Sequence, residues 1–263
     1  MMKSPGSVAA GGLSDKERIR IKMKYYIDNL VIEVTRKCNM NCAHCLRGDA
    51  QNIDIDTAYI DRLLENVEGI GNITFSGGEP SLNIHAIEYT LLACQERHIS
   101  VGSFYVVTNG KTNALPLAIA CLKWYAYCDC AEDMCGLALS KDMFHDEVQR
   151  ENENILKGLS FFRHDKYTDF NKVKIINTGR AELLGGYDKM DVEFHDEKFS
   201  YFGDDESGYT IESMIYLSAN GEIRTNCDSA YDDDNYTIGD LRRDSFDYVV
   251  NCQMVELLDV LPI

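Results

Sequence analysis

Short apolar runs alternate along the chain with longer segments of helical periodicity. Runs rich in β-branched residues, typical of buried strands, lie at residues 28–35, 71–78, 101–110, 135–140 and 172–179. Apolar positions at helical spacing separate these runs at residues 55–70, 83–98, 115–127 and 145–163. Ser81 or Asn83 would cap the second helix. Five such repeats predict a parallel sheet with crossover helices, either doubly wound or curled towards a barrel.

The alternation ends near Gly186. Residues 211–227 alternate around Asn220-Gly221, which predicts a β-hairpin, and a closing helix is expected around residues 245–258. We therefore expect three parts in the chain. They are a flexible tail at residues 1–24, an α/β core at 25–185 and a small C-terminal extension at 186–263.

The loops after the first four predicted strands carry the residues that could bind a ligand or take part in a reaction. These loops contain C-x3-C-x2-C (Cys38, Cys42 and Cys45), "SGGEP" (76–80), "TNG" (108–110) and "SKDMFH" (140–145). Catalytic groups of α/β folds collect at the carboxyl ends of parallel strands. We therefore expect the four loops to converge on one site.

Composition bears on whether the cysteines form disulfides or bind a metal. The chain has 263 residues, ten cysteines and a formal net charge of −17, with most of the excess after Gly186. Such a surface repels nucleic acid, no apolar run is long enough for a membrane span, and the first residues lack a signal-peptide core. We expect a cytoplasmic protein in which the thiols stay reduced, so closely spaced cysteines indicate metal binding or chemistry rather than disulfides.

Three thiols within eight residues fit an iron–sulfur cluster better than a structural zinc site. Zinc prefers four tetrahedral ligands, and His44 stands too close to Cys45 for both to bind one zinc with ease. A 4Fe–4S cluster held by Cys38, Cys42 and Cys45 would keep one iron open to an outside ligand.

From Val31 to Glu182 the sequence resembles the radical S-adenosylmethionine (SAM) superfamily. The resemblance rests on C-x3-C-x2-C after the first strand, "SGGEP" after the second, "TNG" after the third and a serine after the fourth. It implies that Cys38, Cys42 and Cys45 bind a 4Fe–4S cluster and that SAM is the second cofactor. The SAM contacts that it implies are His44, in the slot of the family's aromatic residue, Gly77, Gly78, Glu79, Asn109, Ser140 and Arg150. Among these, Glu79 would meet the SAM amino group, Ser140 the ribose and Arg150 the carboxylate.

The same resemblance implies the fold and the chemistry. The fold would be α/β, a partial parallel (β/α)6 barrel with a β-hairpin and helix appended at the C-terminus. The cluster would reduce SAM to a 5′-deoxyadenosyl radical that takes hydrogen from a substrate, with an electron donor such as flavodoxin or ferredoxin. Such a cluster is oxygen-sensitive. No residue on the substrate side is assigned.

The segment "ANGEIRTNCDSAYDDDNYTIGDL" resembles part of a SPASM or twitch extension, found on radical SAM enzymes that modify peptides and proteins. It departs from that pattern because only Cys227 and Cys252 remain, and two thiols cannot fill a four-cysteine cluster site. Cys128, Cys130 and Cys135 are read as small apolar residues, with a second metal site as the alternative. A peptide or protein is therefore the favoured substrate.

Other readings stay open. A glycyl-radical-enzyme activase or a small-molecule or nucleotide-modifying radical SAM enzyme would share the cysteine motif, and an iron–sulfur redox sensor would be non-enzymatic. The intact "SGGEP" argues against the sensor, which needs no SAM site. Asp142 and His145 are expected to contact substrate, to orient Arg150 or to cap a helix. Arg180 and Glu182 face the site or form a surface ion pair, and "RGD" at 47–49 is read as a plain loop.

Overall fold

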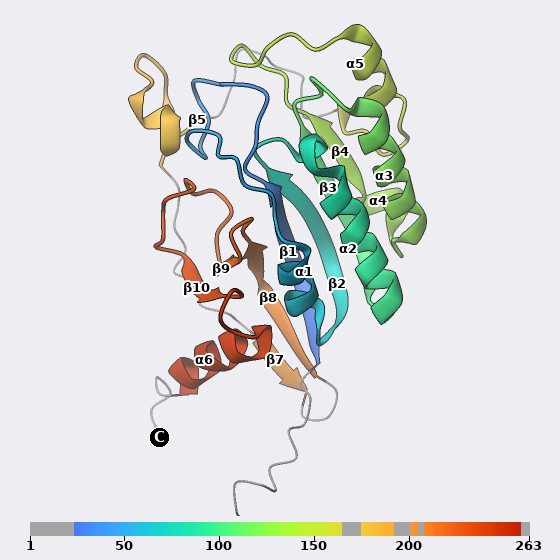
Figure 1. Ribbon diagram of the computed structural model, residues 1–263, viewed down its shortest axis with the longest axis vertical. Coiled ribbons are helices and arrows are strands. Elements are labelled where there is room, and N and C mark those ends of the chain that lie inside the picture. Colours follow the sequence, from blue (N-terminus) through green and yellow to red (C-terminus); the bar gives the residue numbers. More distant parts are fainter. Residues whose placement is uncertain (1–23, 165–174, 192–200, 205–207, 259–263) are drawn as a thin grey trace, which may run out of the picture.

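A mainly parallel sheet of eight strands forms the centre of the molecule (Figure 1). The computed structural model describes residues 24–164, 175–191, 201–204 and 208–258. The strands of this sheet are β1 (Tyr25–Thr35), β2 (Val67–Gly77), β3 (Ser100–Thr108), β4 (Gly136–Leu139), β7 (Tyr201–Asp204), β8 (Gly208–Leu217), β9 (Glu222–Arg224) and β10 (Thr237–Asp240). A second, two-stranded sheet pairs β5 (Ile175–Ile176) with β6 (Lys189–Met190). The expected α/β class is confirmed.

Five neighbouring strands, in the order β8-β1-β2-β3-β4, run parallel. Strands β7 and β9 both pair antiparallel with β8, and β10 continues the sheet beyond β9. The predicted hairpin is confirmed as β8 and β9, with Gly221 at φ 89° in its turn, a conformation that suits glycine. Although β8 lies in the predicted extension, it pairs along β1 from Tyr25 to Ile32.

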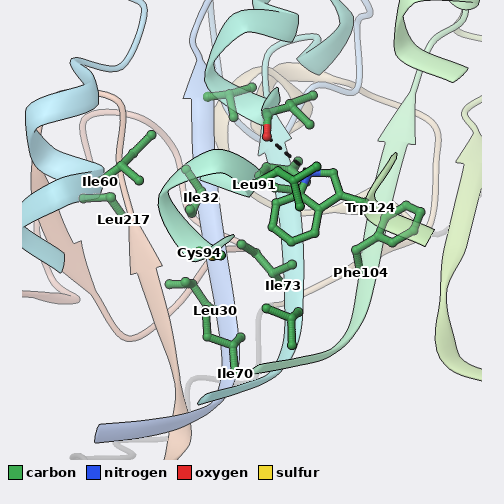
Figure 2. Packing of buried hydrophobic residues seen from close by; sticks show 14 of the residues in the cluster. Leu30, Ile32, Ile60, Ile70, Ile73, Leu91, Cys94, Phe104, Trp124 and Leu217 are labelled. Carbon is green, nitrogen blue, oxygen red and sulfur yellow. Dashed lines mark hydrogen bonds between the residues drawn. The ribbon is translucent and has the colours of Figure 1, made fainter. Parts of the chain in front are cut away.

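One face of the sheet packs against helices and forms the core (Figure 2). The helices are α1 (Thr57–Leu64), α2 (Ile84–Arg97), α3 (Ala114–Tyr127), α4 (Ala131–Met134), α5 (Arg150–Lys157) and α6 (Phe246–Leu258), with 3-10 turns η1 (Pro80–Asn83) and η3 (Gly179–Leu183). Asn83 caps α2 by accepting from the Ala86 amide, as predicted. Trp124 of α3 is fully buried, lies 5.2 Å from the Phe75 ring and donates to the Ile87 carbonyl of α2. This packing fixes the strand ends on which the site depends.

The opposite face of the sheet lines a cavity. Tyr216, Val31, Thr74 and Tyr105 are successive register partners across β8, β1, β2 and β3. The last three of these line the cavity. Side chains along a strand alternate between faces, so the neighbouring residues Leu30, Ile32, Ile73 and Phe104 point into the core instead.

Two predicted elements are wrong in extent, and a third lies partly outside the described residues. The helix predicted over 55–70 is α1 alone, because Val67 and Ile70 pair with β1 as the start of β2. The helix predicted over 145–163 shrinks to α5, since the preceding residues form a loop with its own polar contacts. The strand predicted over 172–179 lies outside the described residues up to 174, and in the described part β5 pairs with β6 rather than with the main sheet. On the free edge of β4, Leu137 forms a single parallel bridge with Phe162.

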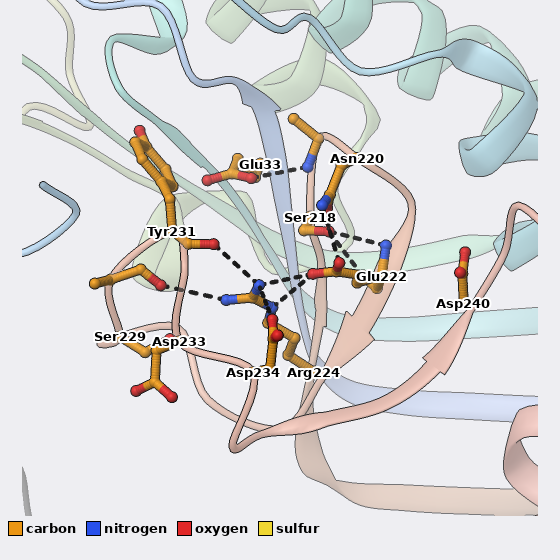
Figure 3. Close-up of polar contacts among 12 residues, drawn as sticks. Glu33, Ser218, Asn220, Glu222, Arg224, Ser229, Tyr231, Asp233, Asp234 and Asp240 are labelled. Atoms are coloured by element: carbon orange, nitrogen blue, oxygen red, sulfur yellow. Dashed lines mark hydrogen bonds and ion pairs between the residues drawn. The ribbon is translucent and has the colours of Figure 1, made fainter. Parts of the chain in front are cut away.

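A polar network ties the hairpin to the segment that follows it (Figure 3). Arg224 is 2% exposed, donates to Glu222 Oε2 from both Nε (3.1 Å) and Nη2 (2.7 Å), and reaches the carbonyls of Ala230 and Tyr231. Glu33 of β1 accepts from the Ala219 amide at 2.8 Å. The hairpin is thereby fixed against β1, beside the cysteine loop.

No helix within the described ranges combines the length and apolar character needed to cross a bilayer. The flexible tail expected at residues 1–24 lies, apart from Lys24, outside the described residues. The boundary expected near residue 185 falls between η3 and β6 and stays a prediction.

Candidate functional site

A cavity of about 1030 Å³ lies at the carboxyl ends of β1 to β4. The four motif loops converge there, as expected for parallel strands. Of the residues singled out from the sequence, those that line it are Cys38, Cys42, His44, Cys45, Gly77, Gly78, Glu79, Asn109, Ser140, Asp142 and His145. The cavity also takes residues from the C-terminal segment, namely Met214, Cys227 and Asp228. One space therefore joins the motifs to the hairpin.

The loop between β1 and α1 holds Cys38, Cys42 and Cys45, which are partly exposed and form no disulfide bond. The Cys45 amide donates to the Cys42 carbonyl, and the Gly48 amide to that of Cys45, so the chain turns tightly through the motif. All three thiols line the cavity.

Burial raises the pKa of the Cys38 thiol, although the Met40 amide acts in the opposite direction. The Asn109 side-chain amide lies 3.9 Å from Cys38 Sγ and donates to Asn39 Oδ1 at 2.8 Å. Asn109 therefore connects the end of β3 with the cysteine loop.

The Gly77-Gly78 turn packs on the backbone of the cysteine loop. Gly77 has φ 151°, and a Cβ on it would lie 2.3 Å from the Thr35 carbonyl oxygen. A Cβ on Gly78 would lie 2.4 Å from the Lys37 carbonyl oxygen, far inside van der Waals contact. The Gly78 amide donates to the Thr35 carbonyl at 2.8 Å. Two glycines are therefore required for loop-to-loop packing, whatever their contact with a ligand.

Glu79 is a buried carboxylate without a cationic partner among the described residues. It is 1% exposed. Oε1 accepts from the Ser81 amide (3.0 Å) and the Thr108 hydroxyl (2.6 Å), and Oε2 accepts from the Asn109 amide (2.7 Å). A carboxylate offers about four acceptor sites, so one remains. Since a buried charge is costly without a counter-charge, the site fits a ligand that carries an ammonium group.

His44, Asp142 and His145 form a compact group beside the thiols. Asp142 accepts from His145 Nδ1 at 2.8 Å and lies 3.4 Å from His44 Nε2. Burial lowers the pKa of His44. Burial also acts to lower that of His145, but Asp142 and Cys42 outweigh it and raise the pKa to about 9. Although the three donors lie close enough for one metal ion, a protonated His145 makes them an ion pair at neutral pH.

The His44 ring also stacks on Phe144, with centroids 4.6 Å apart. Its Nδ1 is buried and has no hydrogen-bond partner within the described ranges. A buried polar atom without a partner is rare in folded proteins, so this nitrogen fits contact with a bound group.

Arg150 does not line the cavity. It is exposed and is the first residue of α5. Asp142 accepts from the Phe144 amide, which closes a short turn, and its side-chain contacts with described residues do not include Arg150. Arg180 of η3 binds the cysteine loop, where its amide donates to the Cys45 carbonyl at 3.0 Å, whereas Glu182 is exposed.

Two cavity residues had no assigned role in the sequence analysis. Arg47, two positions after Cys45, is 8% exposed, and Cys227 has its pKa raised to about 11, chiefly by burial. The remaining cysteines lie elsewhere. Cys128 and Cys135 are buried at the ends of α3 and α4, while Cys130 and Cys252 are exposed. Of the cysteines outside the motif, Cys227 lines the cavity.

Comparisons with known proteins identify this region. The family model of the Radical SAM superfamily matches residues 32–150, from within β1 to the first residue of α5. A stretch of 88 residues is 35% identical to an uncharacterized protein of Methanocaldococcus jannaschii, covering 32% of this chain and 30% of that protein. A match of the same length to the GTP 3′,8-cyclase of Chlorobaculum tepidum is 32% identical and covers 32% of this chain and 26% of that protein. The chain thus spans less than a third of the length of either relative.

A solved structure has a similar fold over a larger part of the chain. Native anSMEcpe, with bound AdoMet and the Kp18Cys peptide, superposes with a TM-score of 0.50 at 10% identity, over 85% of this chain and 80% of that one. Residues 32–150 of this chain therefore form a domain that is similar to the Radical SAM superfamily.

Proposed function

We propose that this chain is a radical SAM enzyme that acts on a peptide or protein. Cys38, Cys42 and Cys45 would hold a 4Fe–4S cluster. SAM would lie along the ends of β2, β3 and β4, where Glu79, Asn109 and Ser140 line the cavity. The observation that carries the proposal is the convergence on one cavity of three thiols and a buried carboxylate that has no cationic partner among the described residues.

The residues present fit both cofactors. Three cysteines leave one cluster iron without a protein ligand. Glu79 would bind the SAM ammonium through a charge-assisted hydrogen bond, with its geometry fixed by Ser81, Thr108 and Asn109. His44 would contact the ligand through its ring or its free Nδ1. Arg150 is exposed and does not line the cavity, and its contact with the SAM carboxylate stays a prediction.

The chemistry that such a cluster supplies, when bound, is one-electron reduction of SAM, which yields the 5′-deoxyadenosyl radical that abstracts hydrogen from a substrate. The protein's own residues bind, orient and shield the reactants. Asn109 holds the Cys38 side of the loop, Arg180 holds the Cys45 side, and the Gly77-Gly78 turn brings Glu79 against both. A ferredoxin or flavodoxin would be the electron donor.

A peptide or protein substrate is supported by two observations. The C-terminal segment, part of which resembles an extension of peptide-modifying enzymes, lines the cavity through Met214, Cys227 and Asp228, and anSMEcpe was solved with a peptide. The match to GTP 3′,8-cyclase favours a small-molecule substrate as the second candidate.

The test is cofactor binding under anaerobic conditions. We would reconstitute the native chain with iron and sulfide, and prepare the Cys38→Ala/Cys42→Ala/Cys45→Ala variant in the same way. The proposal expects about four irons and four sulfides per native chain, with the absorbance and reduced-state EPR signal of a 4Fe–4S cluster, and none in the variant. SAM should perturb that EPR signal. Binding of zinc in place of a cluster, or a cluster indifferent to SAM, would contradict the proposal.

A further inference from the structure

Arg47 is a buried cation whose surroundings supply no anion within hydrogen-bond range. It is 8% exposed, and no carboxylate of the described residues lies within 4.0 Å of it. Burial acts to lower the pKa of Arg47, but Tyr216 and Glu33 outweigh it and raise the pKa. Oε2 of Glu33 accepts from Arg36 Nε (2.9 Å) and the Ala219 amide (2.8 Å), and its Oε1 is buried without a hydrogen-bond partner among the described residues. A buried guanidinium without a counter-ion is costly, so the arrangement calls for an anion from outside.

The guanidinium is held in place, but its donors are not used up. Nη1 donates to the Ser229 carbonyl at 3.0 Å, and the guanidinium carbon lies 5.1 Å from the centre of the Tyr216 ring. The other two nitrogens donate to no described residue, and Arg47 lines the cavity. A guanidinium offers a planar pair of donors that matches a carboxylate.

The position of Arg47 separates it from the proposed SAM site. Glu79 bonds to Thr108 at the end of β3, whereas Arg47 lies over Tyr216 of β8. Strand β1 stands between β8 and β2, which Glu79 follows, and neighbouring strands lie about 4.8 Å apart. The ammonium and carboxylate of one amino-acid head group share a carbon atom, so we assign the anion at Arg47 to a different group from the one bound at Glu79.

The cavity wall around Arg47 comes from the hairpin side. Met214, Cys227 and Asp228 line it, and burial keeps the Cys227 thiol protonated at neutral pH. We propose that Arg47 is the substrate-anchoring residue of this enzyme and that the substrate presents a carboxylate to it, from an acidic side chain or a chain terminus. This inference rests on the proposed function, because it places the substrate in the same cavity as SAM.

Ligand-observed saturation-transfer NMR on the anaerobic, cluster-loaded protein tests the inference without catalysis. The probes are benzoate and its neutral analogue benzamide, each measured with and without saturating SAM. We expect benzoate to bind in preference to benzamide, and SAM to leave the benzoate signal in place. Equal signals from the two probes, or displacement of benzoate by SAM, would overturn the inference. Displacement would assign the anion site to the SAM carboxylate.

Variants locate the binding. Arg47→Gln should weaken benzoate binding about tenfold or more, as expected for loss of a charge-assisted pair. Arg47→Lys keeps the charge but loses the paired donors, so its affinity for benzoate should lie between those of the native chain and Arg47→Gln. Arg243→Gln, at an exposed arginine after β10, is the matched control and should bind as the native chain does. If Arg47→Gln fails to fold, Arg47→Lys and the native probe comparison decide the question. Benzoate binding unaffected by a folded Arg47 variant would also overturn the inference. Because the readout is equilibrium binding, it is independent of whether SAM is cleaved.

Discussion

Glu79 and Arg47 are buried charges of opposite sign that line the same cavity, and neither has an ion-pair partner among the described residues. Glu79 stands at the junction of β2 and β3, and Arg47 on the side of β8. Such a pair is unfavourable in an empty cavity and favourable once ligands complete it. The relationship divides the cavity into a half that suits an ammonium and a half that suits a carboxylate.

Replacing Glu79 by Gln should weaken SAM binding about tenfold to a hundredfold, because an ammonium loses a charged hydrogen-bond partner. The new amide would also face the Ser81 or Asn109 backbone amide, so the variant should lose stability as well. Thr108→Val is the matched control, since it removes one donor to Glu79 but keeps the charge. Calorimetric titration of SAM into each loaded protein checks this, and an unchanged affinity for Glu79→Gln would remove Glu79 from the SAM site.

Replacing Gly78 by Ala should destabilise the cysteine loop. The added Cβ would lie 2.4 Å from the Lys37 carbonyl oxygen, and overpacking of this kind costs about 1–3 kcal/mol. Gly185→Ala provides the control, because nothing lies within 4 Å of its Cβ position. Urea unfolding and cluster content report the difference. Equal stability of the two variants would show that the turn can relax and that its glycines serve another purpose.

Asp240 should make the hairpin segment sensitive to acid. Arg242 donates to it from its backbone amide and its guanidinium, Arg243 adds an ion pair at 3.0 Å, and together they hold the pKa of Asp240 below its ordinary value of 3.8. A depressed carboxyl pKa stabilises the fold above pH 3.8, and this contribution is lost as pH falls through the lower folded value. Asp240→Asn should therefore cost about 2 kcal/mol at pH 7.

The pH dependence distinguishes this effect from a general loss of packing. In urea titrations, the gap between native protein and Asp240→Asn should stay constant from pH 7 to about 4 and shrink below that. Asp244→Asn is a nearby control without an ion pair in the described ranges, and it should change stability little. A gap that is the same at all pH values would mean that the carboxylate charge is not the cause.

Much of the site was predictable because strand order and strand direction follow from short-range patterns. The apolar runs predicted parallel strands, and parallel strands bring their carboxyl ends to one edge, so the four motif loops had to meet. Asn83 was predictable as a cap because capping depends on residues within one helical turn.

The errors occur where distant contacts override local pattern. Val67 and Ile70 fit the helical spacing, but pairing with β1 draws them into β2. Arg150 stands at a family-like distance from Ser140, and it begins α5 as an exposed residue that does not line the cavity. The importance of Arg47 could not be seen in "RGD", because its burial depends on Tyr216 and Ser229, far along the chain.

Formation of 5′-deoxyadenosine tests the central claim most directly. The native chain and the Cys38→Ala/Cys42→Ala/Cys45→Ala variant would be reconstituted anaerobically and mixed with SAM and dithionite, and the product quantified by chromatography. Our account predicts 5′-deoxyadenosine from the native chain and none from the variant. A native protein that carries its full cluster and binds SAM, yet forms no 5′-deoxyadenosine with or without added peptides, would contradict it.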